Sequence, residues 1–405
     1  MAAVLPHSIV ALVKLGLAQG SIYSIRRDKA SPSLVASTLL IFALIGSAVA
    51  LVAMYFLKYE AMLHLLKGAP LVCFFFSMFL VPFLLIESYF FGVLQAIEHF
   101  QLFNRRRLLA SGLSLIGMFV ALVLWHGRLL TALSVTAGLT ILMDLWLIIT
   151  VHRLCRLRLT WDGPLASRLL KFGVKSHLQS IATHMNFRAD VYLVAGILNP
   201  SEVAFYSIAT RLAELLLFVP ESLGTVVYPK QAESGLDQLQ ELTATSCRHV
   251  LFTTLIAGVV LMLIGPQLVV LWYGKAYAPA GPPLYYLVPG VIMMSLFFML
   301  SRNFTSQNRQ GINILASGVA VGGNVVVNLY LIPRMGISGA GLASLLSYSL
   351  ATIILSYFYL TESHKSVREA FIIRRSDLQV YRRLFNDVFG RRAVPATVAR
   401  PAAEG

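Results

Sequence analysis

The sequence predicts an all-α, polytopic membrane protein, and three observations support this prediction. Of its 405 residues, 57% are hydrophobic and only 13% are charged, and the mean hydropathy is +0.74. Soluble globular domains do not reach these values. Apolar runs of about 20 residues recur along the chain, which is the length that a helix needs to cross a bilayer. The alternating strands of about ten residues that are typical of a membrane β-barrel are absent from the sequence.

Eleven apolar segments are predicted to span the membrane, five before a polar, basic stretch and six after it. The first span is the weakest, because Lys14 and Gln19 interrupt it, and we expect this helix to face a cavity. The others are continuous apolar runs bounded by polar residues. The predicted spans are residues 1–24, 33–56, 70–97, 107–125, 129–151, 169–198, 203–228, 249–272, 283–301, 312–332 and 338–360.

The polar stretch divides the chain into two predicted helical lobes. After the last span the chain is basic and amphipathic, with Leu378, Tyr381, Phe385, Val388 and Phe389 roughly on one helical face. This tail is expected either to lie on an anionic membrane surface or to be disordered. The predicted organisation is an N-terminal lobe at 1–152, a cytoplasmic linker at 153–168, a C-terminal lobe at 169–361 and a basic cytoplasmic tail at 362–405.

The distribution of basic residues predicts the orientation in the membrane. The net charge is +15, but the Lys and Arg residues are not clustered on a polar domain, so nucleic acid is not an expected partner. With these spans, one side of the membrane carries about 24 of the 33 Lys and Arg residues and the opposite loops carry about 5. The basic side, which includes residues 105–107 and Arg302, is predicted to be cytoplasmic, together with the C-terminus.

An internal repeat relates the two halves. Residues 109–112 (LASG) recur 206 positions later as residues 315–318, and a weaker similarity pairs residues 20–26 with 224–230. Both halves then enter the membrane from the same side, which is a parallel repeat about an axis along the membrane normal. Five helices in the first half and six in the second suggest six plus six in the full protein, with one N-terminal helix missing from this sequence.

The segment from 169 to 230 is unusual because it places titratable residues inside apolar helices. A charge in the hydrocarbon core costs several kcal/mol unless it faces a partner or a water-filled cavity. Helical spacing places three cationic or titratable residues on one face of the first helix and a mixed, mostly acidic set on the second. The first set is His177, His184 and Arg188, and the second is Arg211, Glu214 and Glu221, with Asp190 between them.

Two main interpretations of these residues remain open, besides the possibility that their charged ends only reach the membrane interface. In the first, Arg188 pairs with Glu214 and Arg211 pairs with Asp190, and both buried pairs only hold the helices together. In the second, the excess positive face lines a water-filled cavity and binds an anionic group, because a guanidinium group matches phosphate oxygens bidentately.

Three further charges are isolated within predicted spans: Lys14, Glu87 and Asp144. Lys14 could extend a cationic lining into the first lobe. Glu87 and Asp144, like Glu214, Asp190 and Glu221, are candidates for binding a coupling H⁺ or Na⁺ ion or for lining the cavity. Each of the three isolated charges could equally be paired within the protein and have no role in transport. The sequence shows no metal-ligand spacing, no nucleotide-binding loop and no nucleophile elbow, so no cofactor and no enzymatic activity are expected.

Several short motifs together resemble a known transporter family. The order of the motifs follows the order of the helices over nearly the whole chain. They resemble those of the bacterial polysaccharide transporters, the O-antigen and lipid-linked oligosaccharide flippases of the multidrug/oligosaccharidyl-lipid/polysaccharide (MOP) superfamily. The motifs are residues 188–190 (RAD), 206–214 (YSIATRLAE), 223–225 (LGT), 228–229 (YP), 272–274 (WYG) and 339–341 (GAG), with Pro220, Tyr277, Asn324, Asn328, Pro333 and Gly336.

The resemblance implies a fold and a function. Family members have two six-helix lobes that form an inverted V, as in MATE transporters, around a cationic cavity. They move a polyprenyl-diphosphate-linked oligosaccharide from the inner to the outer leaflet of the bacterial inner membrane for surface polysaccharide biosynthesis, such as O-antigen of lipopolysaccharide, with ion coupling in several cases. Partners would be the lipid-linked glycan, the bilayer, and the glycan polymerase and chain-length machinery.

The resemblance also suggests binding residues. Arg211 is similar to the cavity arginine of the lipid II flippase branch, and Glu214 follows at the same interval. We therefore expect the diphosphate to bind Arg211 and Arg188, with Lys14 and His184 nearby. Two alternatives remain: an ion-coupled multidrug exporter of the same superfamily, or a membrane-embedded glycan polymerase or acyltransferase, although the latter needs large polar outer loops.

Overall fold

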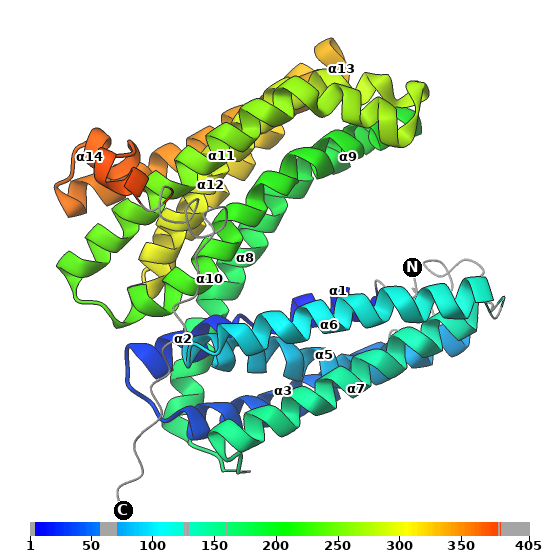
Figure 1. Ribbon diagram of the computed structural model, residues 1–405, viewed down its shortest axis with the longest axis vertical. Coiled ribbons are helices and arrows are strands. Elements are labelled where there is room, and N and C mark those ends of the chain that lie inside the picture. The colour runs from blue at the N-terminus through cyan, green and yellow to red at the C-terminus, as the bar shows by residue number, and fades with distance from the viewer. Residues whose placement is uncertain are drawn as a thin grey trace, which may run out of the picture.

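The computed structural model describes residues 5–56, 71–124, 126, 129–158, 160–379 and 381. All regular elements in this part of the chain are helices. The helices form two lobes that meet near one end and diverge toward the other, so that the molecule has the shape of a V (Figure 1). This arrangement confirms the predicted all-α, two-lobed fold.

The N-terminal lobe contains the first half of the chain. Its first predicted span is two helices rather than one, because the chain breaks at Leu15 and Gly16, whose φ angles are +45° and +62°. The predicted single helix over 1–24 was therefore wrong. The elements of this lobe are α1 (Leu5–Val13), α2 (Leu17–Arg26), α3 (Pro32–Phe56), α5 (Leu71–Ala96), α6 (Phe100–Phe119) with a π-helical extension (Val120–Leu124), and α7 (Leu129–Cys155).

The second half of the chain forms most of the C-terminal lobe. The predicted spans 312–332 and 338–360 form one long element, α13, with a kink at Gly336, whose φ of +60° is accessible to glycine. Each of the eleven predicted spans thus has a helical counterpart. The elements are α8 (Gly163–Ile197), α9 (Pro200–Glu214), a 3₁₀ turn (Leu215–Leu217), α10 (Phe218–Glu233), α11 (Leu236–Tyr273), a second 3₁₀ turn (Lys275–Ala280), α12 (Gly281–Ser306), α13 (Gln310–Ser363) and α14 (Val367–Phe371).

Eight helical runs within the described residues are long and apolar enough to cross a membrane. Polar N-caps separate the helices where the sequence suggests breaks. The Asp162 side chain accepts a hydrogen bond from the backbone N–H of Leu165 at 2.8 Å, which starts α8. The Asn199 side chain accepts one from the N–H of Glu202 at 3.0 Å, and Pro200 occupies the first turn of α9.

Helix α8 connects the two lobes. Near its start, Leu165 and Leu169 are buried in the hydrophobic core of the N-terminal lobe. Farther along, Phe187 and Val194 are buried in the core of the C-terminal lobe. The connection between α7 and α8 is shorter than the predicted linker 153–168, because α7 continues to Cys155 and α8 begins at Gly163. The boundary between the lobes therefore lies inside a helix.

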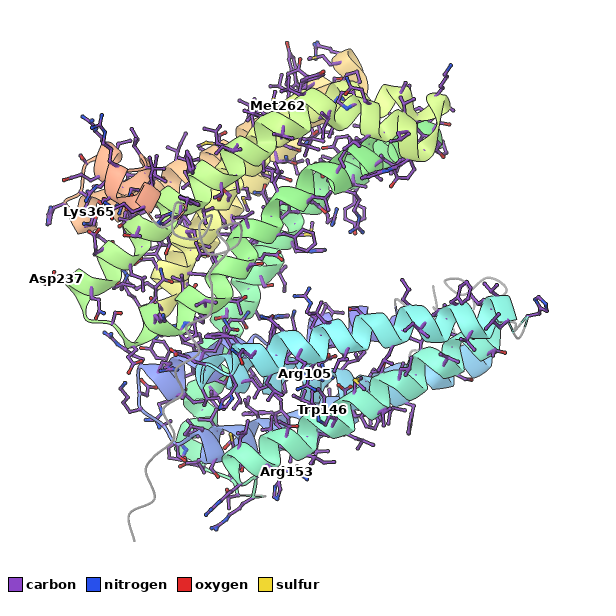
Figure 2. The ribbon with its side chains drawn as sticks, viewed as in Figure 1. Arg105, Trp146, Arg153, Asp237, Met262 and Lys365 are labelled. Atoms are coloured by element: carbon purple, nitrogen blue, oxygen red, sulfur yellow. The ribbon has the colours of Figure 1, made fainter. Side chains whose placement is uncertain are left out.

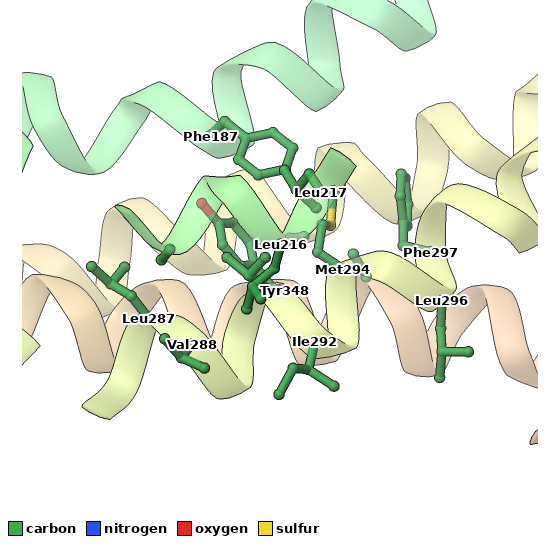
Figure 3. Packing of buried hydrophobic residues seen from close by; sticks show 14 of the residues in the cluster. Phe187, Leu216, Leu217, Leu287, Val288, Ile292, Met294, Leu296, Phe297 and Tyr348 are labelled. Atoms are coloured by element: carbon green, nitrogen blue, oxygen red, sulfur yellow. The ribbon is translucent and has the colours of Figure 1, made fainter. Parts of the chain in front are cut away.

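The core of the C-terminal lobe is built from side chains of several helices. Phe187 of α8 packs against Tyr348 of α13, with ring centroids 5.2 Å apart. Leu217, Met294 and Phe297 surround this pair (Figure 3). Contacts of this kind hold membrane helices together by close packing, because lipid provides little hydrophobic driving force between helices. Packing in this core holds α8 in place, so that the side of α8 facing the other lobe has a fixed position.

The two ends of the V carry different chemistry. Asp237 and Lys365 lie at one end of the C-terminal lobe, and Arg153 lies at the same end of the N-terminal lobe (Figure 2). The lobes meet toward this end, which we call the closed end, and they diverge toward the other, which we call the open end. Arg153, one of the basic residues that predict the cytoplasmic side, lies at the closed end (Figure 2).

The chain after α13 packs against the closed end of the C-terminal lobe. The buried Arg248 of α11 donates from Nε to Asp377 at 2.7 Å and from Nη1 to the carbonyl of Glu369 at 2.8 Å. Burial raises the pKa of Asp377. Hydrogen bonds from Arg248 and from a backbone N–H together lower this pKa by more than burial raises it, so that it lies below the usual value. Tyr381 contacts His249 at 2.8 Å.

This segment is thus a folded cap on the C-terminal lobe. Of the two predictions for the tail, disorder was wrong for residues 364–379, whereas its position on the membrane surface stays a prediction. The other members of the predicted amphipathic face, Phe385, Val388 and Phe389, lie outside the described residues.

Candidate functional site

A cavity of about 700 Å³ lies between the two lobes, where they converge. The N-terminal lobe contributes α2, α5 and α6 to its wall, and the C-terminal lobe contributes α8, α9, α10 and α12. Most of the polar lining is neutral, and includes Gln19, Gln95, Gln179, Thr183 and Thr305. Amides and hydroxyls of this kind can both donate and accept hydrogen bonds.

Four of the predicted site residues line this cavity: His184, Arg188, Glu214 and Glu221. Arg188 and Glu214 form an ion pair, with Nη1 and Oε1 3.1 Å apart and side chains 27% and 17% exposed. The pair predicted in the first interpretation is confirmed. Because Glu214 neutralises Arg188, the face that was predicted to be cationic carries no large excess of positive charge here.

Arg211 does not line the cavity in this conformation. It is exposed on α9, three residues before Glu214, which places it on the same helix face one turn toward the open end. Asp190 is fully buried in the C-terminal lobe, where it accepts hydrogen bonds from Tyr206 Oη and, at 2.7 Å, from Ser344 Oγ. The predicted pairing of Arg211 with Asp190 was therefore wrong.

Lys14 and His177 also lie away from the cavity lining. Lys14 is in the turn between α1 and α2 and is half-buried. His177 faces this turn: a Cβ atom at Gly16 would lie 3.0 Å from its backbone nitrogen and 2.5 Å from the carbonyl oxygen of Gly173. The two glycines let the break between α1 and α2 approach α8 closely. Lys14 does not extend a cationic lining in this conformation.

Glu87 and Asp144 are not isolated charges. Both pair with Arg106: Glu87 Oε1 lies 2.6 Å from Nη1, and the fully buried Asp144 accepts from Nη2. The Arg106 guanidinium is 3% exposed and lies over the Phe91 ring, 4.8 Å from its centroid. Arg106 was assigned to a cytoplasmic loop, and this was wrong because α6 begins at Phe100.

A second arginine that the sequence places in a loop lies in the cavity wall. Helix α12 continues to Ser306 rather than ending at Ser301, so Arg302 is within the helix and lines the cavity. Beside it, Gln179 donates to Ser301 Oγ at 2.7 Å and accepts from Thr305 at 3.1 Å. Asn313 donates to Gln179 at 3.0 Å. These neutral residues could not be recognised as site residues from the sequence, because only charged residues are unusual enough in apolar helices to stand out.

Ion pairs join the two lobes on the closed side of the cavity. Glu233, at the end of α10, lies 2.9 Å from Arg26 Nη1 of α2 and 2.6 Å from Lys29 Nζ. Deeper in, Gln95 of α5 donates to the carbonyl of Thr225 at 2.7 Å. Residues 20–26 and 224–230, the weaker part of the internal repeat, lie in α2 and α10, which contact each other here. The closed end is thus held by contacts between related segments.

The two helical lobes, with eight runs in the described part of the chain that are long and apolar enough to cross a membrane, define a multi-pass membrane protein. A family model described as lipid II flippase MurJ matches residues 29–380, and the chain belongs to this family. Membership of the flippase family is therefore shown, whereas the resemblance to O-antigen transporters stays a prediction.

Individual relatives are distant. The curated protein "Probable low-salt glycan biosynthesis flippase Agl15" of Haloferax volcanii is 20% identical over 197 residues, which is 48% of this chain and 42% of that protein. The match thus spans about two fifths of that relative's length.

Solved structures show the same fold at low identity. An outward-facing multidrug resistance MATE transporter of the MOP superfamily has a TM-score of 0.77 at 14% identity, covering 89% of this chain and 86% of its own. The Vibrio cholerae MATE transporter VcmN in its bent form has a TM-score of 0.73 at 15% identity, with 91% and 89% covered. A MOP superfamily transporter from Pyrococcus furiosus, described as having a binding pocket of reversed polarity, has a TM-score of 0.72 at 14% identity, with 89% and 86% covered.

Proposed function

We propose that this protein is a flippase that moves a polyprenyl-diphosphate-linked oligosaccharide from the inner to the outer leaflet of the bacterial inner membrane. The observation that supports this most is the chemistry of the cavity between the lobes. Arg188 and Arg302 line it together with many neutral amides and hydroxyls. Guanidinium groups match phosphate oxygens, and amides and hydroxyls match the hydroxyl groups of sugars.

The cavity suits the head group of such a lipid better than its prenyl chain. Its volume of about 700 Å³ is within the usual range of pockets for small ligands. The prenyl chain would remain in lipid at the gap between the lobes. With the closed end on the cytoplasmic side, as the basic loops predict, this conformation is open to the outside, and rocking of the lobes would expose the cavity to the inner leaflet.

An ion-coupled multidrug exporter is the second candidate, and one observation favours it. Glu214 and Glu221 line the same cavity, and carboxylates attract cationic drugs. Glu214 is already paired with Arg188, which leaves Glu221 as the main acidic group.

In the flippase proposal, the glycan would be supplied by glycosyltransfer on the cytoplasmic side and used by a polymerase with chain-length machinery outside.

Replacing Arg211 with alanine is expected to slow flipping by roughly 10- to 100-fold, because a hydrogen bond to a charged group contributes about 1.5–3 kcal/mol. Arg211 lies on α9 one turn before Glu214, on the side of the open end, where a substrate would leave the cavity. The measurement is the transbilayer movement of a fluorescent undecaprenyl-diphosphate disaccharide in proteoliposomes. Arg334→Ala, at an exposed arginine of α13, is the control.

The result also separates the two candidates. Normal flipping by the Arg211 variant would remove this residue from the proposed path. Absence of flipping by the unaltered protein, together with transport of a cationic dye, would favour the exporter.

We further propose that the coupling ion, H⁺ or Na⁺, binds at Asp190. Its carboxylate is buried among hydroxyl groups and forms no ion pair with a described Lys or Arg, whereas Glu87, Asp144 and Glu214 each have an arginine partner. Asp190→Asn should therefore abolish the dependence of flipping on an imposed ion gradient, while Asp144→Asn should retain it. Flipping assayed with and without H⁺ or Na⁺ gradients tests this, and a gradient response that persists in Asp190→Asn would show that coupling occurs elsewhere.

A further inference from the structure

The guanidinium group of Arg302 packs closely against one face of α10, at a position that we call the seat. Its Nη1 donates a hydrogen bond to the carbonyl oxygen of Pro220 at 2.9 Å. The side chain is half-buried and lines the cavity. This bond uses one of the five N–H donors of the guanidinium group. The group is thus fixed at one edge, and the remaining donors are available on the cavity side.

The seat exists because residue 224 is glycine. A Cβ atom at Gly224 would lie 1.7 Å from Arg302 Nη1 and 1.9 Å from its Cζ, so any larger residue would displace the guanidinium group from this position. Pro220, Gly224 and Tyr228 recur every four residues along one side of α10 and are all buried. Pro220 and Gly224 contact Arg302 of α12, whereas Tyr228 packs with buried residues of the N-terminal lobe. The Tyr228 hydroxyl is buried without a hydrogen-bond partner among the described residues. A second donor therefore lies on the same face as the seat.

The charge of Arg302 is available to a ligand. Arg188, the other arginine of the lining, is paired with Glu214. No described carboxylate lies within the 4.0 Å limit of an ion pair with Arg302. Glu221 lines the same cavity and would balance its charge over a longer range. A planar guanidinium group held at one edge can present a two-pronged donor set to phosphate oxygens.

We propose that Arg302 is the principal anion-binding residue of the cavity, that it binds the diphosphate of a prenyl-diphosphate substrate, and that Gly224 is the positioning residue that seats it. This inference rests on the proposed flippase function and adds a residue for the diphosphate that differs from Arg211. In this arrangement the diphosphate binds at the deep end of the cavity, beside Tyr228, and the sugars extend along the neutral wall of Gln179 and Thr183.

The test is binding of farnesyl diphosphate to the purified full chain in detergent, measured by calorimetry. Arg302→Ala should weaken binding by about 10- to 100-fold, and Arg302→Lys should recover it only in part because an ammonium group lacks the fork. Gly224→Ala should weaken it to a similar extent although every charge is retained. Gly318→Ala is the matched control, since a Cβ atom there meets nothing within 4 Å.

The outcomes separate this inference from the proposed function. If the unaltered protein does not bind farnesyl diphosphate, the proposed function is wrong. If it binds and the Arg302 and Gly224 variants bind equally well, only the inference about this seat is wrong. If Arg302→Ala does not fold, as judged by its melting temperature, the farnesyl diphosphate affinities of Arg302→Lys and Gly224→Ala test the inference instead. Equal affinity for inorganic diphosphate would overturn the assignment to a lipid-linked ligand, and markedly weaker binding supports it.

Discussion

Replacing Arg106 with leucine is expected to lower the free energy of unfolding by about 3–5 kcal/mol, because removing one partner of a buried ion pair leaves an uncompensated charge. The guanidinium group is shared by Glu87 and Asp144, and Asp144 is fully buried. The group also lies over the Phe91 ring, and this contact is lost as well. The measurement is reversible unfolding of the purified protein in mixed micelles.

The neighbouring arginine provides the control. Arg107 is exposed on the same helix, so Arg107→Leu should change the stability by only a few tenths of a kcal/mol. Adding Glu87→Gln and Asp144→Asn to Arg106→Leu should recover much of the loss, because no buried charge then lacks a partner. Equal stability of the Arg106 and Arg107 variants would mean that the cluster does not stabilise the lobe.

Arg106 and Arg302 also show where sequence reasoning fails. Both lie immediately beyond the ends of predicted spans, 107–125 and 283–301, because hydropathy sets the end of a span where a charge appears. In the structure α6 begins at Phe100 and α12 ends at Ser306. Each arginine lies within its helix and bonds to another helix of its lobe. A charge near a helix end has the same local sequence whether it faces water or the interior.

The fold was more predictable than the site. Helix positions follow from apolar length, and the breaks at Asn199 and Asp162 follow from N-cap chemistry. Helical spacing correctly placed His184 and Arg188 on the cavity face. Spacing could not show that Glu214 neutralises Arg188, or that Tyr206 and Ser344 satisfy Asp190, because the choice among partners depends on how the helices pack. It also could not show the break at Gly16, which depends on contact with Gly173 of another helix.

Replacing Glu233 with arginine is expected to open the closed end of the V. Glu233 pairs with Arg26 and Lys29 across the two lobes. Partly exposed pairs of this kind contribute only about 0.2–1 kcal/mol each, but reversing the charge converts both attractions into repulsions, which cost several kcal/mol when like charges are juxtaposed. A change of about 1.4 kcal/mol alters a conformational equilibrium tenfold, so the population with separated closed ends should increase by more than tenfold.

Spin labels at Arg153 and Asp237, on opposite lobes near this end (Figure 2), report the change as a longer distance in pulsed electron resonance. Glu362→Arg is the matched control, since Glu362 pairs with Arg309 at 2.6 Å within one lobe at the same end. Arg26→Glu together with Lys29→Glu should restore the short distance in the Glu233→Arg background, because the attraction is then re-formed with the signs exchanged. If reversal at Glu233 leaves the distance distribution unchanged, the neutral contact of Gln95 with Thr225 and the packing of α2 against α10 suffice to hold the lobes together. In that case the proposed alternating access would be governed at the cavity itself, where Arg302 and the Arg188–Glu214 pair are proposed to contact the substrate.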